Sequence, residues 1–428
     1  MTLVKVQNFN FQKIINFLLS LIPFSFIAGN LLINLNIALI IIVSLIFWKL
    51  QFFKIKYFFI DKILILFFLL TIIVNLINIS YFLSIDFNLA KENFLKSIFF
   101  FRYLLFYIAI RHVVEKNIFD FKIFFISSSF CIIFVSLDLI YQFTFGSDFF
   151  GLHKTQYHSS GPFGDELIAG SYLQRFGIFI FFLFPFLRNK LEDKYSIIIL
   201  IFLFLIIFFS IIISGNRMPT ILFVMFFLIL LISEKRLRKF FITIVPLICI
   251  FFLLIYNLNS QISNITDHFL KTSYQILTSF NEVFSDSNIK FTNMYLKEFN
   301  LGYLTWKENI FFGGGINSFY LNCKINYDFC SNHPHNYYLE ILSELGIIGL
   351  LLITIFFTSL LYFYFILKSN LSNNFNQNLI IPFTLLFFIE IFPIKTSGSF
   401  FTTGNASYIF FIIAVMVGLI NNMRYSKS

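Results

Sequence analysis

The chain is built from long apolar runs, mostly about 17 to 24 residues each, separated by short polar breaks. A helix of that length crosses the ~30 Å of hydrocarbon in a bilayer and satisfies its own backbone hydrogen bonds. Because 58% of the residues are hydrophobic and only 12% are charged, a soluble fold could not cover so much apolar surface. The sequence therefore predicts an all-α integral membrane protein with about twelve transmembrane helices, near residues 14–29, 31–48, 62–83, 97–113, 122–145, 166–187, 195–213, 217–232, 240–258, 337–367, 378–394 and 405–422.

The distribution of basic residues orients these helices. With twelve spans both termini share one side, and placing them in the cytoplasm puts 19 of the 31 basic residues in cytoplasmic breaks. Short cytoplasmic breaks are the ones enriched in lysine and arginine, so we expect both termini inside. The net charge of +10 then sets topology and contacts anionic membrane lipids. We expect no nucleic-acid partner.

We expect residues 1–428 to form a single polytopic membrane domain whose longest break, 259–336, faces outward. Two sets of apolar residues in that loop recur at helical spacing and predict two amphipathic helices. Such helices would lie on the outer membrane interface as a rim or lid, or they would simply pack on the ends of the spans. The two sets are Ile262, Ile265, Phe269, Ile276, Phe280 and Val283, and then Tyr295, Phe299, Tyr303, Trp306 and Ile310.

Two of the four cysteines, Cys323 and Cys330, lie seven residues apart in this outer loop. In an oxidising compartment they are candidates for a disulfide that closes a small loop before His333. The alternative is a pair of unbonded thiols.

Ionisable residues inside the predicted spans are costly and usually line a polar cavity. All six that we identify lie in the outer half of their span, which predicts a cavity that opens outward. The alternative is that ion pairs, such as Arg102 or Arg175 with Asp138 or Glu390, hold the helices together. A transporter for a polar substrate would also need polar residues in the inner half. The six are Arg102, Asp138, Arg175, Glu340, Glu344 and Glu390.

The stretch His333-Pro334-His335-Asn336 opens the span near 337–367 and carries the candidate chemistry. A neutral imidazole takes a proton from a hydroxyl near neutral pH, and Glu340 or Glu344 would raise the basicity of His335. The alternative is loop polarity or a helix cap. A metal site built from His333, His335 and His153 or His158 lacks the carboxylate or cysteine ligands usual for zinc, so we predict no metal.

Arg217 lies in the turn Ser214-Gly215-Asn216-Arg217-Met218-Pro219, at the outer mouth of the span 217–232. A guanidinium group holds a phosphate through paired hydrogen bonds. The alternative is an arginine at a helix end that reaches toward the membrane interface.

Several of these features together resemble one family. His335-Asn336, nine residues, Gly346, two residues and Gly349 is similar to the signature of the bacterial O-antigen ligase and O-antigen polymerase superfamily. The turn before Arg217 is also similar, as are the segments Gly313–Phe319 and Gly161–Gly164. The resemblance covers about residues 150–365.

The resemblance implies a membrane glycosyltransferase fold of the GT-C type in the bacterial inner membrane, with the active face in the periplasm. The donor would be a glycan linked to undecaprenyl diphosphate, and no metal or other cofactor would be required. His335 would be the general base for an acceptor hydroxyl that attacks the anomeric carbon with inversion. Arg217 would stabilise the diphosphate, and His333, Asn336 and Glu340 would orient the histidine or the acceptor.

One departure from the family is the lack of a second arginine in the long loop, because no arginine occurs between residues 259 and 336. Lys290, Lys297 or Lys307 would supply the charge, or Arg175 would compensate from within the membrane. A ligase would use lipid A-core as the acceptor, whereas a polymerase would use a second lipid-linked repeat unit. The alternative from another class is a non-enzymatic flippase or transporter of lipid-linked oligosaccharide.

Overall fold

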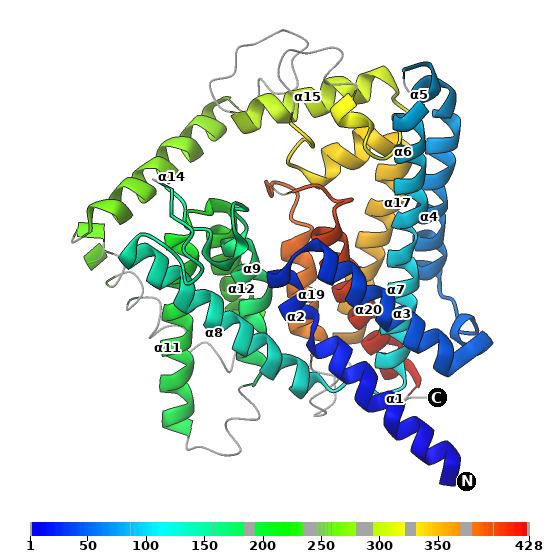
Figure 1. Cartoon of the computed structure of the whole chain (residues 1–428), viewed down its shortest axis with the longest axis horizontal. Helices are drawn as coiled ribbons and strands as arrows, with labels where there is room; N and C mark the ends of the chain where they lie inside the picture. The colour runs from blue at the N-terminus through cyan, green and yellow to red at the C-terminus, as the bar shows by residue number, and fades with distance from the viewer. Residues whose placement is uncertain are drawn as a thin grey trace. The chain divides into compact units, whose positions relative to one another are not determined.

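In the computed structural model, every regular element in the described part of the chain is a helix (Figure 1). The structure describes residues 2–85, 87–155, 157–183, 193–233, 259–279, 294–321, 331–368, 379–396 and 398–425, with a few single positions between 246 and 257. The helices are α1 (Thr2–Ser20), α2 (Ile22–Ala28), α3 (Asn30–Trp48), η1 (Lys49–Phe53), α4 (Phe59–Ile77), α5 (Ile79–Ile85), α6 (Phe87–Phe100), α7 (Arg102–Glu115), α8 (Phe121–Phe145), η2 (Gly161–Phe163), α9 (Ala169–Phe176), η3 (Gly177–Leu183), α11 (Asp193–Ile213), α12 (Arg217–Ser233), α14 (Ser260–Ser279), α15 (Met294–Glu308), α17 (Tyr337–Lys368), α19 (Ile380–Glu390) and α20 (Thr403–Tyr425).

These helices confirm an all-helical membrane protein, but they do not confirm the number of spans. Among the described residues, six helices are long and apolar enough to cross a membrane, and the bent pair 10–20 and 22–28 makes up to seven. Four further apolar stretches, at 169–183, 198–213, 217–230 and 380–390, lie in helices at the positions of four more predicted spans, but they are too short to count as spans by themselves. Most of the predicted span 240–258 lies outside the described residues. The count of twelve therefore stays a prediction, as does the GT-C architecture.

Packing divides the chain into two compact units, each assembled from two stretches of sequence. Unit 1 comprises residues 1–39 and 118–272, and unit 2 comprises residues 40–117 and 273–428. The single membrane domain expected from the sequence stays a prediction.

Unit 1 is organised around α8, which packs on α1, α2, α9, η3 and α11 (Figure 1). Phe125 and Phe179 stack inside it with ring centroids 5.8 Å apart. Asn16 joins α1 to the start of α8, because its Nδ2 donates to the Ile118 carbonyl at 2.9 Å and its Oδ1 accepts from Asp120 N at 2.8 Å. Apolar packing and a few satisfied polar contacts thus hold this unit together.

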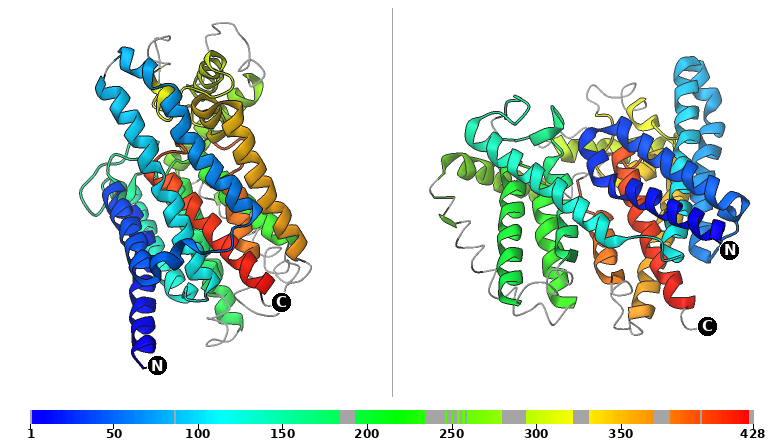
Figure 2. Two further views of the ribbon diagram at one scale, coloured as in Figure 1. Left: turned by 90° about the vertical axis from the view of Figure 1, so that its right-hand side faces the viewer. Right: turned by 60° about the horizontal axis from the view of Figure 1, so that its bottom comes forward.

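In unit 2, α17 packs along α4, and α20 packs along α7 and α19 (Figures 1 and 2). Gly418 permits the close approach of α20 to α7, since a Cβ there would lie 2.7 Å from Val114 Cβ. The core between these helices is aromatic, with Phe68 and Phe410 at 5.1 Å and Phe100 and Phe401 at 5.1 Å between ring centroids. The hydrophobic effect does not drive helices together within a lipid bilayer. Close helix contacts and packed aromatic rings therefore stabilise this unit.

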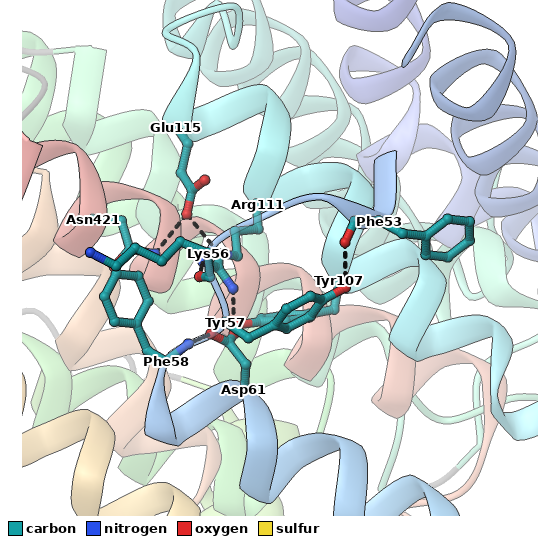
Figure 3. Close-up of polar contacts among 9 residues, drawn as sticks. All are labelled: Phe53, Lys56, Tyr57, Phe58, Asp61, Tyr107, Arg111, Glu115 and Asn421. Atoms are coloured by element: carbon teal, nitrogen blue, oxygen red, sulfur yellow. Dashed lines mark hydrogen bonds and ion pairs between the residues drawn. The ribbon is translucent and has the colours of Figure 1, made fainter. Parts of the chain in front are cut away.

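One end of unit 2 contains a buried cluster of charged side chains (Figure 3). Arg111 on α7 is fully buried and forms an ion pair with Asp61 on α4, which is 1% exposed. Its Nε donates to Glu115 Oε1 at 2.6 Å, and its Nη2 donates to the Lys56 carbonyl at 2.8 Å. Tyr107 donates its hydroxyl to Asp61 at 2.5 Å. The guanidinium therefore has charged or polar partners on three of its atoms.

The same cluster reaches a third helix. Asn421 on α20 donates to Glu115 Oε1 at 2.6 Å, and the backbone N–H of Phe58 donates to Asp61 Oδ2 at 2.6 Å. Arg111 thereby ties α4, α7, α20 and the segment before α4 together. Fully partnered buried charges of this kind specify one arrangement of helices, because any other arrangement leaves a charge without a partner.

This cluster corrects the expectation that buried charge is confined to the outer half of the spans. By the predicted orientation, Arg111 and Asp61 lie toward the cytoplasmic end, yet both are almost completely buried. The sequence interpretation counts Arg111 among the 19 basic residues of the cytoplasmic breaks. Local sequence cannot show that Asp61 comes from another helix to neutralise it.

Two helices predicted in the loop 259–336 are present as α14 and α15, whereas Phe280 and Val283 of the first predicted set lie outside the described residues. On α14, Leu270, Tyr274 and Leu277 are exposed, at 58%, 70% and 79% respectively. An exposed apolar stripe suits the predicted position at the membrane interface. That position stays a prediction.

We predict that Arg111→Met destabilises the protein by about 3–5 kcal/mol, because it leaves the Asp61 carboxylate buried without its cation. Equilibrium unfolding of the detergent-solubilised protein measures this. The matched control is Lys116→Met, which removes an exposed cation from the same end of α7. Equal stability of the two variants would show that the ion pair contributes nothing.

Candidate functional site

The candidate site in unit 2 includes Asn336, the residue that caps the N-terminus of α17. Asn336 Oδ1 accepts from the backbone N–H groups of Tyr338 at 3.0 Å and Leu339 at 3.2 Å, as an N-cap side chain does. Its Nδ2 donates to the Pro393 carbonyl at 2.8 Å, which ties the helix start to the segment after α19. Asn336 of the signature therefore has a structural role, and its predicted contact with substrate stays a prediction.

His335 precedes this cap in a left-handed backbone conformation, with φ of 52°. Few residues other than glycine adopt such a φ, so the surrounding contacts must hold it. The side chain is 30% exposed, and its Nε2 lies 3.4 Å from Glu298 Oε2. The Tyr295 ring meets it edge-on with centroids 5.7 Å apart. His335 is thus accessible from one side and held by α15 on another.

His333 lies directly against His335, with ring centroids 4.2 Å apart. The pKa of His333 is lowered to about 4, mainly by burial and also by the neighbouring His335. His333 is therefore neutral near pH 7 and adds no second positive charge beside His335. This is consistent with a role in orienting its neighbour, which stays a prediction.

Glu298 is the functional candidate that the sequence interpretation missed. Its carboxyl group is 3% exposed, and burial raises its pKa to about 7. Glu298 lies three residues after Tyr295 and one before Phe299, on the apolar face predicted for α15. A carboxylate on an apolar helix face was a usable signal, but the sequence does not show which group it meets.

Gly302 explains how α15 brings Glu298 so close to His335. A Cβ at Gly302 would lie 2.8 Å from Pro334 Cβ and 3.4 Å from Leu339 Cβ. The missing side chain therefore lets α15 pack directly on the His333–Asn336 stretch.

Glu340 and Glu344 have other partners than the one expected. Glu340 Oε2 accepts from Phe400 N at 2.5 Å, and Glu344 Oε1 accepts from Asn317 N at 2.9 Å. Both carboxyl groups are buried on the first turns of α17 and hold neighbouring backbone segments. The expectation that one of them supports His335 is corrected, because Glu298 occupies that position. The proposed contact of Glu340 with substrate stays a prediction.

The signature glycines mark a backbone crossing. Gly346 has φ of 66° and interrupts α17, and a Cβ there would lie 2.2 Å from the Phe311 carbonyl oxygen. Ile347 N donates to the Ile310 carbonyl at 3.0 Å, and Gly315 N donates to the Glu344 carbonyl at 2.7 Å. The Gly313–Phe319 segment is thereby fastened to the beginning of α17.

Arg217 begins α12 in unit 1 and has its own cluster of partners. Its Nη2 lies 3.3 Å from His268 Nε2 on α14, and the Tyr157 ring stacks on His268 with centroids 4.8 Å apart. His158 Nδ1 lies 3.4 Å from the Ser214 carbonyl oxygen. Burial is the main cause that lowers the pKa of His268, followed by the Arg217 charge. An anion bound here would meet an arginine and a histidine together.

Two further contacts hold the turn before Arg217. Gly215 has φ of 73°, and a Cβ there would lie 2.1 Å from the Tyr157 carbonyl oxygen. Asn216 Oδ1 accepts from Gly170 N at 2.9 Å, which joins the turn to α9. The sequence places His268 only within the outer loop 259–336. Its position beside Arg217 depends on how α14 folds back, which sequence spacing does not show.

The remaining predicted residues are placed as follows. Arg175 lies on α9 in unit 1 and is 9% exposed, whereas Lys297 lies on α15, next to Glu298, and is half-buried. Cys323 and Cys330 lie outside the described residues. His335 belongs to unit 2 and Arg217 to unit 1, so their pairing in one site stays a prediction. Within the described ranges, no three His, Cys, Asp or Glu side chains are grouped as metal ligands.

The fold and these clusters define a polytopic helical membrane protein with a histidine–carboxylate pair and an arginine–histidine pair, both involving helices of the long loop. The family model described as O-antigen ligase matches residues 201–354, which include all four of these side chains. This match confirms the resemblance of this region to the O-antigen ligase and polymerase superfamily. No curated protein matches the chain.

We predict that Gly346→Ala prevents stable folding, because the new methyl group would meet the Phe311 carbonyl as well as strain the backbone. The matched control is Gly164→Ala, since Gly164 has nearly the same φ of 65° but open space around its Cβ position. The free energy of unfolding of the control should fall only by the cost of backbone strain, about 1–3 kcal/mol. Membrane levels and unfolding in detergent measure both variants. Equal losses of stability in the two variants would show that the backbone crossing at Gly346 does not stabilise the fold.

Proposed function

We propose that the protein transfers a glycan from undecaprenyl diphosphate to an acceptor hydroxyl at the periplasmic face of the bacterial inner membrane. It would act as an O-antigen polymerase or an O-antigen ligase in surface polysaccharide assembly. The observation that carries the proposal is the half-exposed His335 imidazole against the buried Glu298 carboxyl, inside the region matched by the O-antigen ligase family. An exposed imidazole backed by a carboxyl group is suited to removing a proton from a hydroxyl.

In the proposed reaction, the acceptor hydroxyl gives its proton to His335 while its oxygen forms a bond to the anomeric carbon. The bond between that carbon and the diphosphate oxygen breaks, and its electron pair leaves with undecaprenyl diphosphate. The configuration at the carbon inverts, and His335 later releases the proton to water. The leaving group takes on negative charge, so a fixed cation near it would lower the barrier.

Arg217 is the cation that we propose for the diphosphate, in place of any metal ion or other cofactor. Its contact with His268 supports this assignment, because His268 is contributed by the loop in which the family carries a second arginine. A bound diphosphate would favour protonation of His268 and would then contact two positive groups. Arg175 and Lys297 remain further candidates for contacts with the donor.

The alternative function, transport of lipid-linked oligosaccharide, would need a polar path through both halves of the membrane. Among the described residues toward the predicted cytoplasmic end, the buried Arg111 and Asp61 pair with each other, and Arg111 also pairs with the partly exposed Glu115. Charged groups that pair with one another stabilise the packing of the helices at that end, and they do not line a path for a polar substrate. This supports the enzymatic proposal.

We predict that His335→Ala abolishes surface glycan in a deletion strain while the protein stays in the membrane at its normal level. The reason is loss of the proton acceptor. The matched control is His153→Ala, which removes an exposed histidine from another loop and should restore normal glycan. Normal glycan from the His335 variant would exclude this histidine from the mechanism.

The deletion strain also separates the two forms of the proposal. Gel analysis of its lipopolysaccharide would show core with a single repeat unit if the protein is a polymerase. Bare core, with long chains retained on undecaprenyl diphosphate, would identify a ligase that uses lipid A-core. An unchanged pattern would contradict both.

We predict that Arg217→Lys lowers glycan transfer about tenfold or more, since a hydrogen bond to a charged group contributes about 1.5–3 kcal/mol and lysine lacks the paired donors. His268→Gln should lower transfer less, because it removes only the second positive group. Release of undecaprenyl diphosphate from glycan-loaded membranes measures both. Full activity of Arg217→Lys would argue against bidentate binding of the diphosphate.

A further inference from the structure

The carboxyl group of Glu298 has an environment that packing alone does not explain. It is 3% exposed, and its Oε2 has no hydrogen-bond partner within normal geometry. Enclosing such an oxygen costs free energy that an apolar side chain at the same position would avoid. His335 Nε2 lies 3.4 Å from this oxygen. The unsatisfied oxygen is thus aimed at the proposed general base.

The distance between these two groups suits a resting state. A charge-assisted hydrogen bond between nitrogen and carboxylate is about 2.7–2.9 Å long, and catalytic contacts are often longer before substrate binds. When His335 takes a proton, its ring acquires a positive charge and attracts the carboxylate. The contact would then shorten with little movement, because both groups are already in place.

The backbone around the pair is held from both sides. Gly302 lets α15 pack on Pro334, and the Asn336 cap fixes the start of α17 immediately after His335. His333 and Tyr295 contact the imidazole on its other faces. Such support is what keeps a catalytic side chain in a productive orientation.

We propose that Glu298 is a positioning residue that orients His335 and stabilises the imidazolium formed when His335 accepts the proton of the acceptor hydroxyl. This inference rests on the proposed glycosyl transfer. Glu298 itself touches neither the sugar nor the diphosphate, and it neither gains nor loses a covalent bond.

The protonation of the pair supports this role. Burial raises the pKa of Glu298 to about 7, although a hydrogen bond from Ser331 acts in the opposite direction. A positive charge on His335 would favour the ionised carboxylate, so the two groups titrate as a pair. His333 faces the same ring and is neutral near pH 7, since burial lowers its pKa to about 4. The carboxylate of Glu298 is therefore the counter-charge that faces the imidazolium.

The test compares Glu298→Gln with Glu298→Asp and with the matched control Glu308→Gln, an exposed glutamate on the same helix. The probe is native lipid-linked glycan in membranes of the deletion strain, and the measurement is release of undecaprenyl diphosphate against pH. We predict that Glu298→Gln lowers the maximal rate about tenfold to a hundredfold, within the range that supporting groups of reactive side chains contribute. Glu298→Asp should recover part of the rate, and Glu308→Gln should match the unmodified protein.

The rate falls at low pH as His335 becomes protonated, and the position of this acidic limb of the pH–rate profile is the second readout. A purely structural role of Glu298 would not change it. Removing the negative charge makes the imidazolium less stable, so His335 loses its proton more easily and the limb moves to lower pH. A rate loss with an unshifted limb, in protein that unfolds normally in detergent, would overturn the positioning role. A full rate from Glu298→Gln would also overturn it.

A parallel His335→Ala sample separates this inference from the proposed function. If His335→Ala is inactive and Glu298→Gln is fully active, the inference fails and the glycosyl transfer proposal stands. If His335→Ala retains activity, the proposed function fails, and the role of Glu298 fails with it.

Discussion

The backbone crossing between residues 310–315 and the bend of α17 holds the candidate site in place. At this crossing, Gly346 lies against the carbonyl of Phe311, and Gly313 lies against the backbone of Glu344. Buried backbone groups must find partners within the protein, and these segments satisfy one another through the pairs Gly315–Glu344 and Ile347–Ile310. The crossing also sets where α15 ends. It therefore connects the helix that carries Glu298 to the helix that His335 precedes.

Unit 2 uses polar contacts for two different purposes. The cluster around Arg111 is fully partnered and connects α4, α7 and α20, so its charges stabilise one arrangement of helices. Near the beginning of α17, by contrast, Glu298 and His333 keep buried polar atoms without hydrogen-bond partners. Incomplete satisfaction of buried polar groups is costly, and proteins commonly retain it where chemistry requires it. Other buried atoms of unit 2, such as Asn75 Oδ1 and His112 Nδ1, also have no hydrogen-bond partner, so it is the position of Glu298 beside His335 that distinguishes the candidate site.

Much of the fold follows from hydrophobic periodicity, because a helix that faces lipid must be apolar along its whole length. The long spans such as 59–77 and 121–145, and the amphipathic helices α14 and α15, were predictable for that reason. The span predicted at 378–394 was too long at its end, because α19 ends at Glu390. The apolar run of α19 continues into a turn in which Ile391 is buried but Ile394 is 59% exposed, and local hydrophobicity does not show where such a helix ends. Similarly, Arg111 was assigned to a polar break although it is fully buried.

By itself, the sequence determined the membrane class, the candidate histidine His335, the arginine Arg217 and the family resemblance, since these depend on residue type and spacing along one chain. Only the tertiary structure decided which side chains accompany them. It placed Glu298, rather than Glu340, beside His335, and it placed His268 beside Arg217. Both partners come from helices of the long loop, 37 and 51 residues away in the chain. Contacts over such separations depend on how helices cross, and small residues such as Gly302 set those crossings through close packing that no local pattern encodes.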